Sequence, residues 1–496
     1  MIQGAAGRIA RIAKAAAAKT ASRAENGAAW SSKIPAANAI SGGIRGSRTE
    51  TIVSERSQNS PRYHDLLRLT AIVLLWWLPL DAQQSSLPTD QLNRDLPHWV
   101  SFSGDERVRL EGFSGGGFRP GNDDLYVLNR FRLSTTLRPE SWWKIVAQTQ
   151  DARAWGDNQT PHGPPHQDTW DLRQAYAELG DPDKNPVALR VGRQEISLGG
   201  ERLVGVSQWQ NVGRSFDAAR LMVHYRKLRL TAFAASVVVL HDGQVGSADA
   251  GNNLHGLYAS IADCIPNSTL EPYFMWRLQP NIKSELGPLG HLDMKVSGAR
   301  WLGKVRALDY NTSIVLESGS AAADQVDAWA GHWLLAYSFP KLPGAIRLVA
   351  EYNYATGDGN PHDGRGNTFQ LLYPTAHDRH GLSDQVGWRN IHHVRGTVEI
   401  KPHPKWTLTP SYNAFWLADA RDALYNSQGN VVVARVPDGS AGRWVGQELD
   451  LAAAYSITRV TQLAAGFAHI FPGTFLHRAA PGGAYSYPYL QITTKF

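Results

Sequence analysis

The sequence predicts an all-β protein, a transmembrane antiparallel β-barrel of about 18 strands, within a range of about 16 to 20. Three observations lead to this fold class. Short segments of alternating apolar and polar residues recur from about residue 98 onward. That part of the chain contains no apolar stretch of about 18 residues, the length that marks a membrane-spanning helix. The chain also ends in an alternating segment whose last residue is aromatic, Phe496.

The terminal segment, residues 487–496, has a period of two. Leu490, Ile492 and Phe496 share one face, whereas Lys495 falls on the other. A terminal aromatic residue on such a strand resembles the sorting signal of bacterial outer-membrane barrels. We therefore expect this strand to seal the barrel and to bind the barrel insertion machinery. The expected location is the bacterial outer membrane, with outer-membrane lipid around the strands.

Composition favours a barrel over a bundle of membrane helices. The 496 residues are 43% hydrophobic, and their mean hydropathy of -0.33 is too polar for such a bundle. Barrel strands give this average because residues that face lipid alternate with residues that face the lumen. The chain has one cysteine, Cys264, so an internal disulfide is excluded. In an oxidising compartment a single cysteine acts most simply as a small hydrophobe.

The formal charge of +6 is confined to the amino-terminal part of the chain. Of 50 Lys and Arg residues and 44 Asp and Glu residues, eleven and five lie within residues 1–83, which leaves 39 of each. The remainder is neutral overall, so binding of anions must depend on where the arginines lie. We expect no nucleic-acid partner.

The chain divides into three parts. Residues 1–60 are rich in Ala, Gly, Ser and Arg and are predicted to be disordered or an untranslated extension. Residues 61–84 combine basic Arg62 with a short apolar run and small residues, which predicts a secretory signal peptide. The run is shorter than the about 20 residues of a membrane anchor, the alternative interpretation. A signal this far from Met1 suggests that translation starts downstream. Residues 98–496 form the barrel.

Residues 129–138 show the alternation most clearly. Arg130 and Arg132 lie on one face, and Phe131 and Leu133 lie on the other. In a barrel the apolar face meets lipid and the charged face lines the lumen, whereas in a soluble secreted β-protein the apolar face would form a core. Similar segments are residues 107–111, 143–151, 172–179, 187–193, 219–224, 228–239, 254–262, 270–278, 293–302, 307–316, 328–339, 345–354, 392–400, 406–416, 448–457 and 462–470.

The connections between these segments have two lengths. Tight connections suit the periplasmic side of a barrel and longer ones the extracellular side. The tight connections include residues 138–141, 340–344 and 401–404. The longer ones include residues 156–169, 240–253, 357–384 and 418–443.

Four blocks carry a resemblance to a known family. The first is residues 192–205 (GRQEISLGGERLVG), continuing through Trp209, residues 214–217 (RSFD) and Arg220. The later blocks are residues 351–358 (EYNYATGD), 372–377 (LYPTAH) and 446–451 (GQELDL). In this order the blocks resemble the alginate-export family of outer-membrane porins, and the resemblance covers roughly residues 98–496.

The resemblance implies a wide barrel that passes an anionic polysaccharide, alginate or a similar uronate polymer, outward by diffusion through an arginine-rich lumen. Guanidinium groups stay charged and offer planar forks that match carboxylates. A lumen of one sign concentrates the opposite ion. Interspersed acidic residues would keep each site from binding too tightly, because conduction needs binding that can be reversed.

Eight residues are candidates for pore-lining or substrate contact. They are Arg130, Arg132, Arg193, Arg202, Arg214, Arg220, Glu195 and Asp217. Arg130 and Arg132 lie on the polar face of a strand, and the others lie in the first family-like block. The alternative is structural, because a pair such as Arg214 and Asp217 can brace a turn and lumen arginines are often held in ion pairs.

Enzymatic function has little support in the sequence. The chain lacks the HExxH motif and paired cysteines. An outer-membrane hydrolase would need a Ser–His pair facing lipid near the rim, and none can be placed. No cofactor is predicted; residues 357–367 could offer oxygen ligands to calcium, but Gly and Asp also serve solvated turns. A general or small-anion uptake porin remains the main alternative to an exporter.

Overall fold

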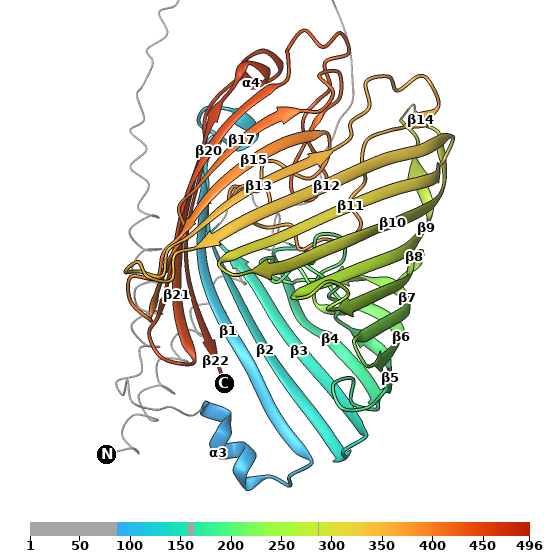
Figure 1. The fold of residues 1–496 in the computed structure, drawn as a ribbon, viewed down its shortest axis with the longest axis vertical. Helices are drawn as coiled ribbons and strands as arrows, with labels where there is room; N and C mark the ends of the chain where they lie inside the picture. Colours follow the sequence, from blue (N-terminus) through green and yellow to red (C-terminus); the bar gives the residue numbers. More distant parts are fainter. Residues whose placement is uncertain (1–86, 157–162, 286) are drawn as a thin grey trace, which may run out of the picture. The chain divides into compact units, whose positions relative to one another are not determined.

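The computed structural model describes residues 87–156, 163–285 and 287–496. The extension predicted at residues 1–60 and the signal predicted at residues 61–84 lie outside the described residues. The strands from Val100 onward form one antiparallel sheet that closes into a barrel of 18 strands (Figure 1). The prediction of an all-β antiparallel barrel is therefore confirmed.

Each barrel strand pairs with the strands before and after it. The strands are β1 (Val100–Phe113), β2 (Asp124–Glu140), β3 (Trp143–Trp155), β4 (Asp168–Leu179), β5 (Val187–Gln194), β6 (Phe216–Tyr225), β7 (Leu228–His241), β8 (Gln244–Ala262), β9 (Ser268–Lys283), β10 (Leu289–Val305), β11 (Leu308–Ala321), β12 (Asp324–Ser338), β13 (Arg347–Ala355), β15 (Ile391–Glu399), β16 (Trp406–Leu408) with its continuation β17 (Ser411–Leu417), β20 (Trp444–Ser456), β21 (Thr461–Pro472) and β22 (Tyr485–Lys495). Three short strands lie in connections: β14 (Arg365–Gly366), β18 (Leu424–Tyr425) and β19 (Val431–Val433).

The barrel closes where the last strand pairs with the first. Leu490 of β22 lies opposite Leu110 of β1 in an antiparallel register. At the end of this seam the N–H of Gly104 donates to the carbonyl of Phe496 at 2.7 Å, and the N–H of Phe496 donates back at 3.0 Å. The prediction that the terminal strand seals the barrel is therefore confirmed, whereas binding of the insertion machinery stays a prediction.

The two faces of the strands differ as the alternation predicts. On β1, Arg107 and Arg109 are buried inside the barrel, and Arg107 lies opposite Arg130 in the register of β2. Large apolar side chains such as Leu316 and Leu451 are exposed on the strands. Exposed apolar side chains on alternate strand positions are the pattern of a surface that meets lipid.

One expected connection is wrong. Residues 240–253 belong almost entirely to a hairpin, because β7 extends to His241 and β8 begins at Gln244. Val239 lies opposite Ser247 within this extension. The polar and glycine-rich sequence indicated a loop, but the backbone N–H and C=O groups pair across a hairpin whatever the side chains are.

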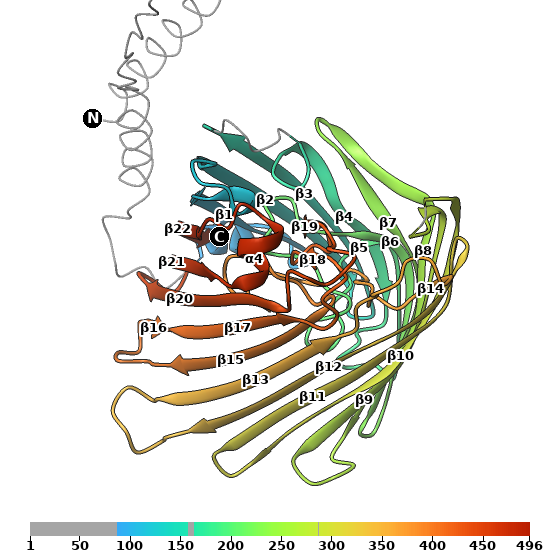
Figure 2. The ribbon, with the colours of Figure 1, turned by 90° about the horizontal axis from the view of Figure 1, so that it is seen from above.

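Three connections at one end of the barrel are long: residues 195–215, which we call the first lumen segment; 356–390, the second; and 418–443, the third. Seen from above, loops lie inside the ring of strands (Figure 2). The first and second segments are joined by a parallel bridge between Val204 and Tyr373. The second segment was expected only as an extracellular connection; it folds inward because its apolar residues, including Phe369 and Leu372, become buried there.

The main hydrophobic cluster therefore lies inside the barrel. It joins Val204 of the first lumen segment and Tyr373 of the second to wall residues such as Leu254 on β8 and Met275 on β9. Val204, Leu254 and Met275 have no exposed surface. This packing holds the segments against the wall through apolar burial.

Helices are few in the described part of the chain. They are α3 (Pro88–Asp95), the 3-10 turn η1 (Gly116–Phe118) and α4 (Thr474–Ala479). None of the helices among the described residues is long and apolar enough to cross a membrane.

Candidate functional site in the barrel interior

Arg130 and Arg132 lie on the inner wall, where they hold the first lumen segment. Their exposed fractions are only 5% and 3%. The Nη2 atom of Arg130 donates to Asp105 at 2.8 Å, and its Nη1 atom donates to the carbonyl of Gln208 at 3.1 Å. The Nη1 atom of Arg132 donates to the side-chain oxygen of Gln208 at 2.6 Å, and its Nη2 atom donates to the carbonyl of Val212 at 3.2 Å. Both guanidinium groups are thus committed to protein acceptors, and their contact with substrate stays a prediction.

Three further candidates form ion pairs around the first lumen segment. Arg193 donates two hydrogen bonds to the carboxylate of Asp217, from Nε at 2.8 Å and from Nη2 at 3.0 Å. Glu195 pairs with Arg173 of β4 and also accepts a hydrogen bond from Gln208 at 3.1 Å. These three candidates therefore form structural ion pairs, which the sequence analysis gave as the alternative to substrate contact.

Arg214 joins the first and second lumen segments. Its Nη1 atom donates to the carbonyl of Pro374 at 3.0 Å. Burial lowers the pKa of Arg214 to about 10, and nearby Tyr373 opposes the shift. The guanidinium group remains charged at neutral pH and is used to connect the two segments rather than to pair with Asp217.

Arg220 differs from the other candidates because it has no hydrogen-bond or ion-pair partner within the described part of the chain, and its Nε atom is buried. It lies beside Arg190 in the register of β5 and β6. Arg190 and Lys144 both pair with Glu178. Two cations therefore share Glu178, and Arg220 lies beside them in this row of the inner wall.

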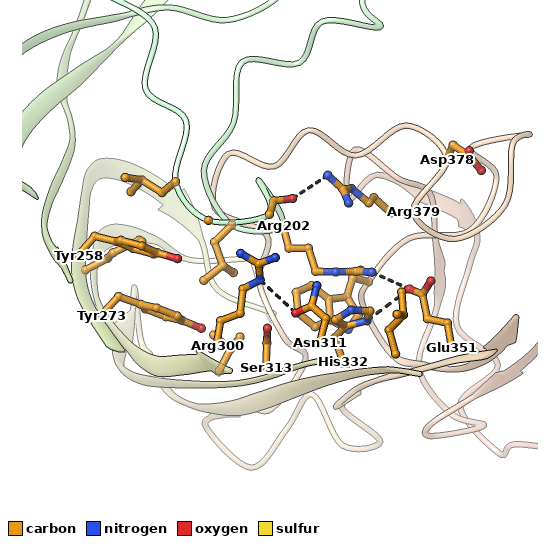
Figure 3. A pocket seen from close by; sticks show the side chains of 18 of the residues that line it. Arg202, Tyr258, Tyr273, Arg300, Asn311, Ser313, His332, Glu351, Asp378 and Arg379 are labelled. Atoms are coloured by element: carbon orange, nitrogen blue, oxygen red, sulfur yellow. Dashed lines mark hydrogen bonds and ion pairs between the residues drawn. The ribbon is translucent and has the colours of Figure 1, made fainter. Parts of the chain in front are cut away.

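The first and second lumen segments enclose a cavity of about 240 Å³ against the wall strands (Figure 3). Four arginines line it: Arg202 from the first segment, Arg379 from the second, Arg300 from β10 and Arg395 from β15. The other lining residues are Leu198, Gly199, Gly200, Leu203, Tyr258, Tyr273, Met275, Asn311, Ser313, Val315, His332, Leu334, Glu351, Asp378 and Trp388.

Of the eight residues predicted from the sequence, Arg202 is the one that lines this cavity. Its Nη2 atom lies 2.6 Å from Glu351 of β13 (Figure 3). Its Nη1 atom is buried and has no partner among the described residues. Burial lowers the pKa of Arg202 to about 10, while Glu351 opposes the shift. Arg202 thus stays charged at neutral pH with one donor atom unused.

Arg300 and Arg379 also have donors left over. The Nη1 atom of Arg300 lies 2.8 Å from Glu271, and its Nε atom donates to Asn311 at 3.0 Å. The Nη2 atom of Arg379 donates to the carbonyl of Gly200 at 2.7 Å. In the described structure the remaining terminal nitrogen of each guanidinium is without a protein acceptor. Such donors suit a carboxylate, which accepts from planar guanidinium forks.

Sequence reasoning missed Arg300, Arg379 and Arg395. Arg300 and Arg395 had a usable signal, since each occupies a strand segment whose alternation was recognised. Arg379 had none, because it lies in an aperiodic connection whose inward fold depends on packing.

No group of three or more His, Cys, Asp or Glu residues in the described ranges is arranged to hold a metal ion. In the loop considered for calcium, Asp358 accepts hydrogen bonds from the backbone N–H groups of Asn360 at 2.7 Å and Asn367 at 2.9 Å. His377 pairs with Asp384 at 2.7 Å. These side chains are used to hold their own loops.

A closed 18-strand barrel with inward-folded segments defines an outer-membrane channel of the porin type. The model of the alginate export family matches residues 98–487. The chain therefore belongs to the alginate export family. This membership and the porin-like fold place the protein in the outer membrane and point to a channel rather than an enzyme.

Solved porins share the fold. OpdK from Pseudomonas aeruginosa superposes with a TM-score of 0.54 at 13% identity, covering 80% of this chain and 99% of that one. OccK8 (OprE) from the same organism superposes with a TM-score of 0.53 at 12% identity, covering 80% of this chain and 98% of OccK8. OpdO, also from Pseudomonas aeruginosa, superposes with a TM-score of 0.53 at 12% identity, covering 82% of this chain and 99% of OpdO. Identities this low show the fold alone. No curated protein matches the chain.

Proposed function

We propose that this channel passes carboxylate-bearing saccharides, alginate or a similar uronate polymer, by facilitated diffusion, and that the arginines inside the barrel select the anion. The observation that carries the proposal is the cavity bordered by Arg202, Arg300, Arg379 and Arg395. Only two carboxylates, Glu351 and Asp378, line the same cavity. Membership in the alginate export family supports the class of cargo.

The physical basis is an excess of positive charge in a confined space. Four guanidinium groups line the cavity against two lining carboxylates and Glu271, which pairs with Arg300. Positive charge is therefore in excess, which raises the local concentration of anions. Each guanidinium already has a protein acceptor that holds it in place, such as Glu271 for Arg300. A solute carboxylate would meet the unused donors and leave again, since no contact there engages a whole guanidinium fork.

A second candidate function is diffusion of small organic acids. The cavity volume of about 240 Å³ suits a single ring with a carboxylate better than several linked sugars. One of the matched barrels, OpdK, has been solved with vanillate. On this alternative the same arginines select monomeric acids and the polymer does not enter.

The test is the reversal potential of the purified protein in a planar bilayer under a salt gradient, followed by titration with oligouronates and with monomeric glucuronate. We expect anion selectivity and block by the oligomers. Block by the monomer alone would favour the small-acid alternative. A cation-selective or unselective channel would refute both.

Arg300→Gln is the variant to compare with the wild type. Loss of one charge-assisted contact of about 1.5 to 3 kcal/mol should weaken block by about tenfold or more. Arg459→Gln is the matched control, because Arg459 is exposed in the turn between β20 and β21, away from the cavity lining. If block by the oligomers weakens equally in both variants, the cavity is not the site of block.

A further inference from the structure

Five buried polar side chains form a continuous row across five neighbouring strands of the inner wall. The row, which we call the His–Asn row, consists of His332 of β12, Asn353 of β13, His393 of β15, Asn413 of β17 and Asp450 of β20. Successive members are 2.9, 3.0, 3.0 and 2.7 Å apart. Each member is at most 2% exposed. Neither the cavity nor the anion contacts use most of these groups.

The hydrogen bonds of the His–Asn row all run in one direction. The amide of Asn353 donates to Nδ1 of His393 and also to Glu351 at 2.9 Å, so its oxygen is left to accept from Nδ1 of His332. Nε2 of His393 donates to Asn413, which donates to Asp450. These partners assign the single ring proton of His393 to Nε2.

The row has no acceptor for a second proton on His393. A proton on Nδ1 would face the amide N–H of Asn353, and two donors cannot form a hydrogen bond. Rotating the Asn353 amide would restore the contact only by losing its bond to Glu351. Protonation therefore breaks the row, and a buried polar group left without a partner is costly.

The second lumen segment sits on the end of this row. The N–H of Ser383 donates to Glu448 at 2.8 Å and its hydroxyl donates to the same carboxylate at 2.7 Å. The N–H of Leu382 donates to Asp450 at 3.3 Å. Gly381 has a φ of +93°, and an added Cβ would lie 2.5 Å from Glu448, so the backbone approaches this wall closely.

His380 of the same segment lies directly over the row. Its ring centroid is 5.3 Å from that of His393. Its Nε2 atom is buried without a partner in the described structure. Burial, then nearby His393 and Arg202, hold the pKa of His380 well below its ordinary value. His380 is therefore neutral where it sits and would gain a proton more readily on leaving.

We propose that the His–Asn row and His380 form a pH-sensitive seat for the second lumen segment, which is held against the wall at neutral pH and released on acidification. The inference rests on the proposed function, because Asp378, Arg379 and Trp388 of this segment form part of the cavity. Release of the segment would widen the path through the cavity and raise conductance.

The charges that face the seat favour this direction. Arg202 of the first lumen segment and Arg395 of β15 are cations near His380 and His393. The facing carboxylates are Glu351 of β13, Asp378 of the second segment, and Glu448 and Asp450 of β20. Glu351 and Asp378 already have arginine partners, and His332 adds a third imidazole. New positive charge on His380 and His393 therefore meets Arg202 and Arg395, whereas Glu448 and Asp450 already accept hydrogen bonds from Ser383 and Asn413.

The sign of the pH effect follows from proton binding. The seated segment binds fewer protons than the released one between the lowered pKa of His380 and its ordinary value near 6.5, so acid favours release. For one such histidine the released fraction should rise by about tenfold for each pH unit below about 6.5.

The experiment is single-channel recording of the full chain between about pH 7.5 and about pH 5.5, the range in which histidine titrates. We expect conductance to rise on acidification in the wild type. The rise should be lost in His380→Gln combined with His393→Gln, which cannot gain a proton. His362→Gln, an exposed histidine of the same segment, is the matched control and should keep the response.

A labelling measurement covers the case in which the double variant fails to assemble. Cysteine is placed at buried Val386 of the same segment in a Cys264→Ser background, and its rate of reaction with a water-soluble thiol reagent is divided by that of a cysteine at exposed Ser440. The ratio removes the general effect of pH on thiolate. We expect it to rise several-fold at the acid pH.

The proposal is overturned if conductance and the labelling ratio are both independent of pH, or if the pH response survives in the double variant. Failure of the proposed function gives a different result. An anion-selective channel without a pH response contradicts only the seat, whereas a pH-dependent channel without anion selectivity contradicts only the cargo.

Discussion

The indole ring of Trp209 lies flat on the imidazole ring of His377, with ring centroids 3.7 Å apart and planes 5° from parallel. Trp209 belongs to the first lumen segment and His377 to the second. The guanidinium carbon of Arg109, on β1, lies 3.8 Å from the indole centroid. The stack therefore ties both segments to the barrel wall at one point.

Replacing Trp209 with alanine should loosen both lumen segments while leaving the barrel intact. Aromatic pairs contribute about 0.5 to 1.5 kcal/mol beyond their buried area, so the segments should leave the wall more often. We expect larger and noisier single-channel currents. Trp142→Ala is the control, because Trp142 is 55% exposed outside the lumen segments. Unchanged currents in Trp209→Ala would show that the stack does not hold the segments.

Arg132 and Gln208 should be energetically coupled. Their side chains meet at 2.6 Å in a charge-assisted hydrogen bond, for which a coupling of about 1.5 to 3 kcal/mol is expected. A double-mutant cycle of Arg132→Gln and Gln208→Ala, with denaturant unfolding in lipid, measures the coupling. Gln325→Ala on β12 is the control partner and should give a coupling near zero. A null result for Gln208 would mean that this contact does not hold the first lumen segment against the wall.

Arg220 and Arg190 should respond differently to neutralisation. Arg220 has no partner among the described residues, so Arg220→Gln should reduce anion selectivity with little effect on stability. Arg190 shares Glu178 with Lys144, and Arg190→Gln should lower stability by removing one partner of a buried carboxylate. Reversal potentials and denaturant midpoints of both variants test this contrast. The opposite assignment of effects would contradict it.

The barrel could be predicted from the sequence because each strand shows its two faces in the order of neighbouring residues. Arg130 and Phe131 are adjacent residues that face opposite sides of β2, and a period of two reveals this without any tertiary contact. The sealing strand was likewise visible in residues 487–496. The hairpin at Val239 and Ser247 was missed because its side chains are those of a loop, while its pairing uses only backbone atoms.

The site could be predicted only in part, because its residues are far apart in sequence. Arg202 and Glu351 are 2.6 Å apart across 149 positions, and no local pattern joins them. The inward fold of the second lumen segment depends on Tyr373 meeting Val204, a contact between two aperiodic stretches. Arginine positions were therefore recognisable as candidates, but whether each braces a segment or faces the cavity was not.

Gly104 should be required for closing the barrel. An added Cβ at Gly104 would lie 2.3 Å from the carbonyl oxygen of Arg132 and 2.5 Å from the ring of Phe496. Overpacking of this kind costs about 1 to 3 kcal/mol, so Gly104→Ala should reduce the folded fraction. The heat-dependent shift in gel migration of folded barrels measures it. Gly396→Ala is the control, because an added Cβ there meets nothing within 4 Å.

Replacing Arg202 with lysine should make the channel sensitive to alkaline pH. Burial lowers the pKa of Arg202 to about 10, so the wild-type residue keeps its charge at neutral pH. The ordinary pKa of a lysine is about 10.4, and in the same surroundings it should fall to about 8. Its charge is lost as pH rises through that value, which removes the cationic partner of Glu351 and makes the cavity less positive.

Reversal potentials at about pH 7 and about pH 9, on either side of the shifted lysine pKa, provide the measurement. Anion selectivity in Arg202→Lys should match the wild type at the lower pH and fall at the higher one, while the wild type changes little. Arg459→Lys, in an exposed turn, is the control. If Arg202→Lys keeps its selectivity at the higher pH, the charge at this position does not govern selection. The unused Nη1 of Arg202 would then belong to the packing of the first lumen segment rather than to the path of the anion.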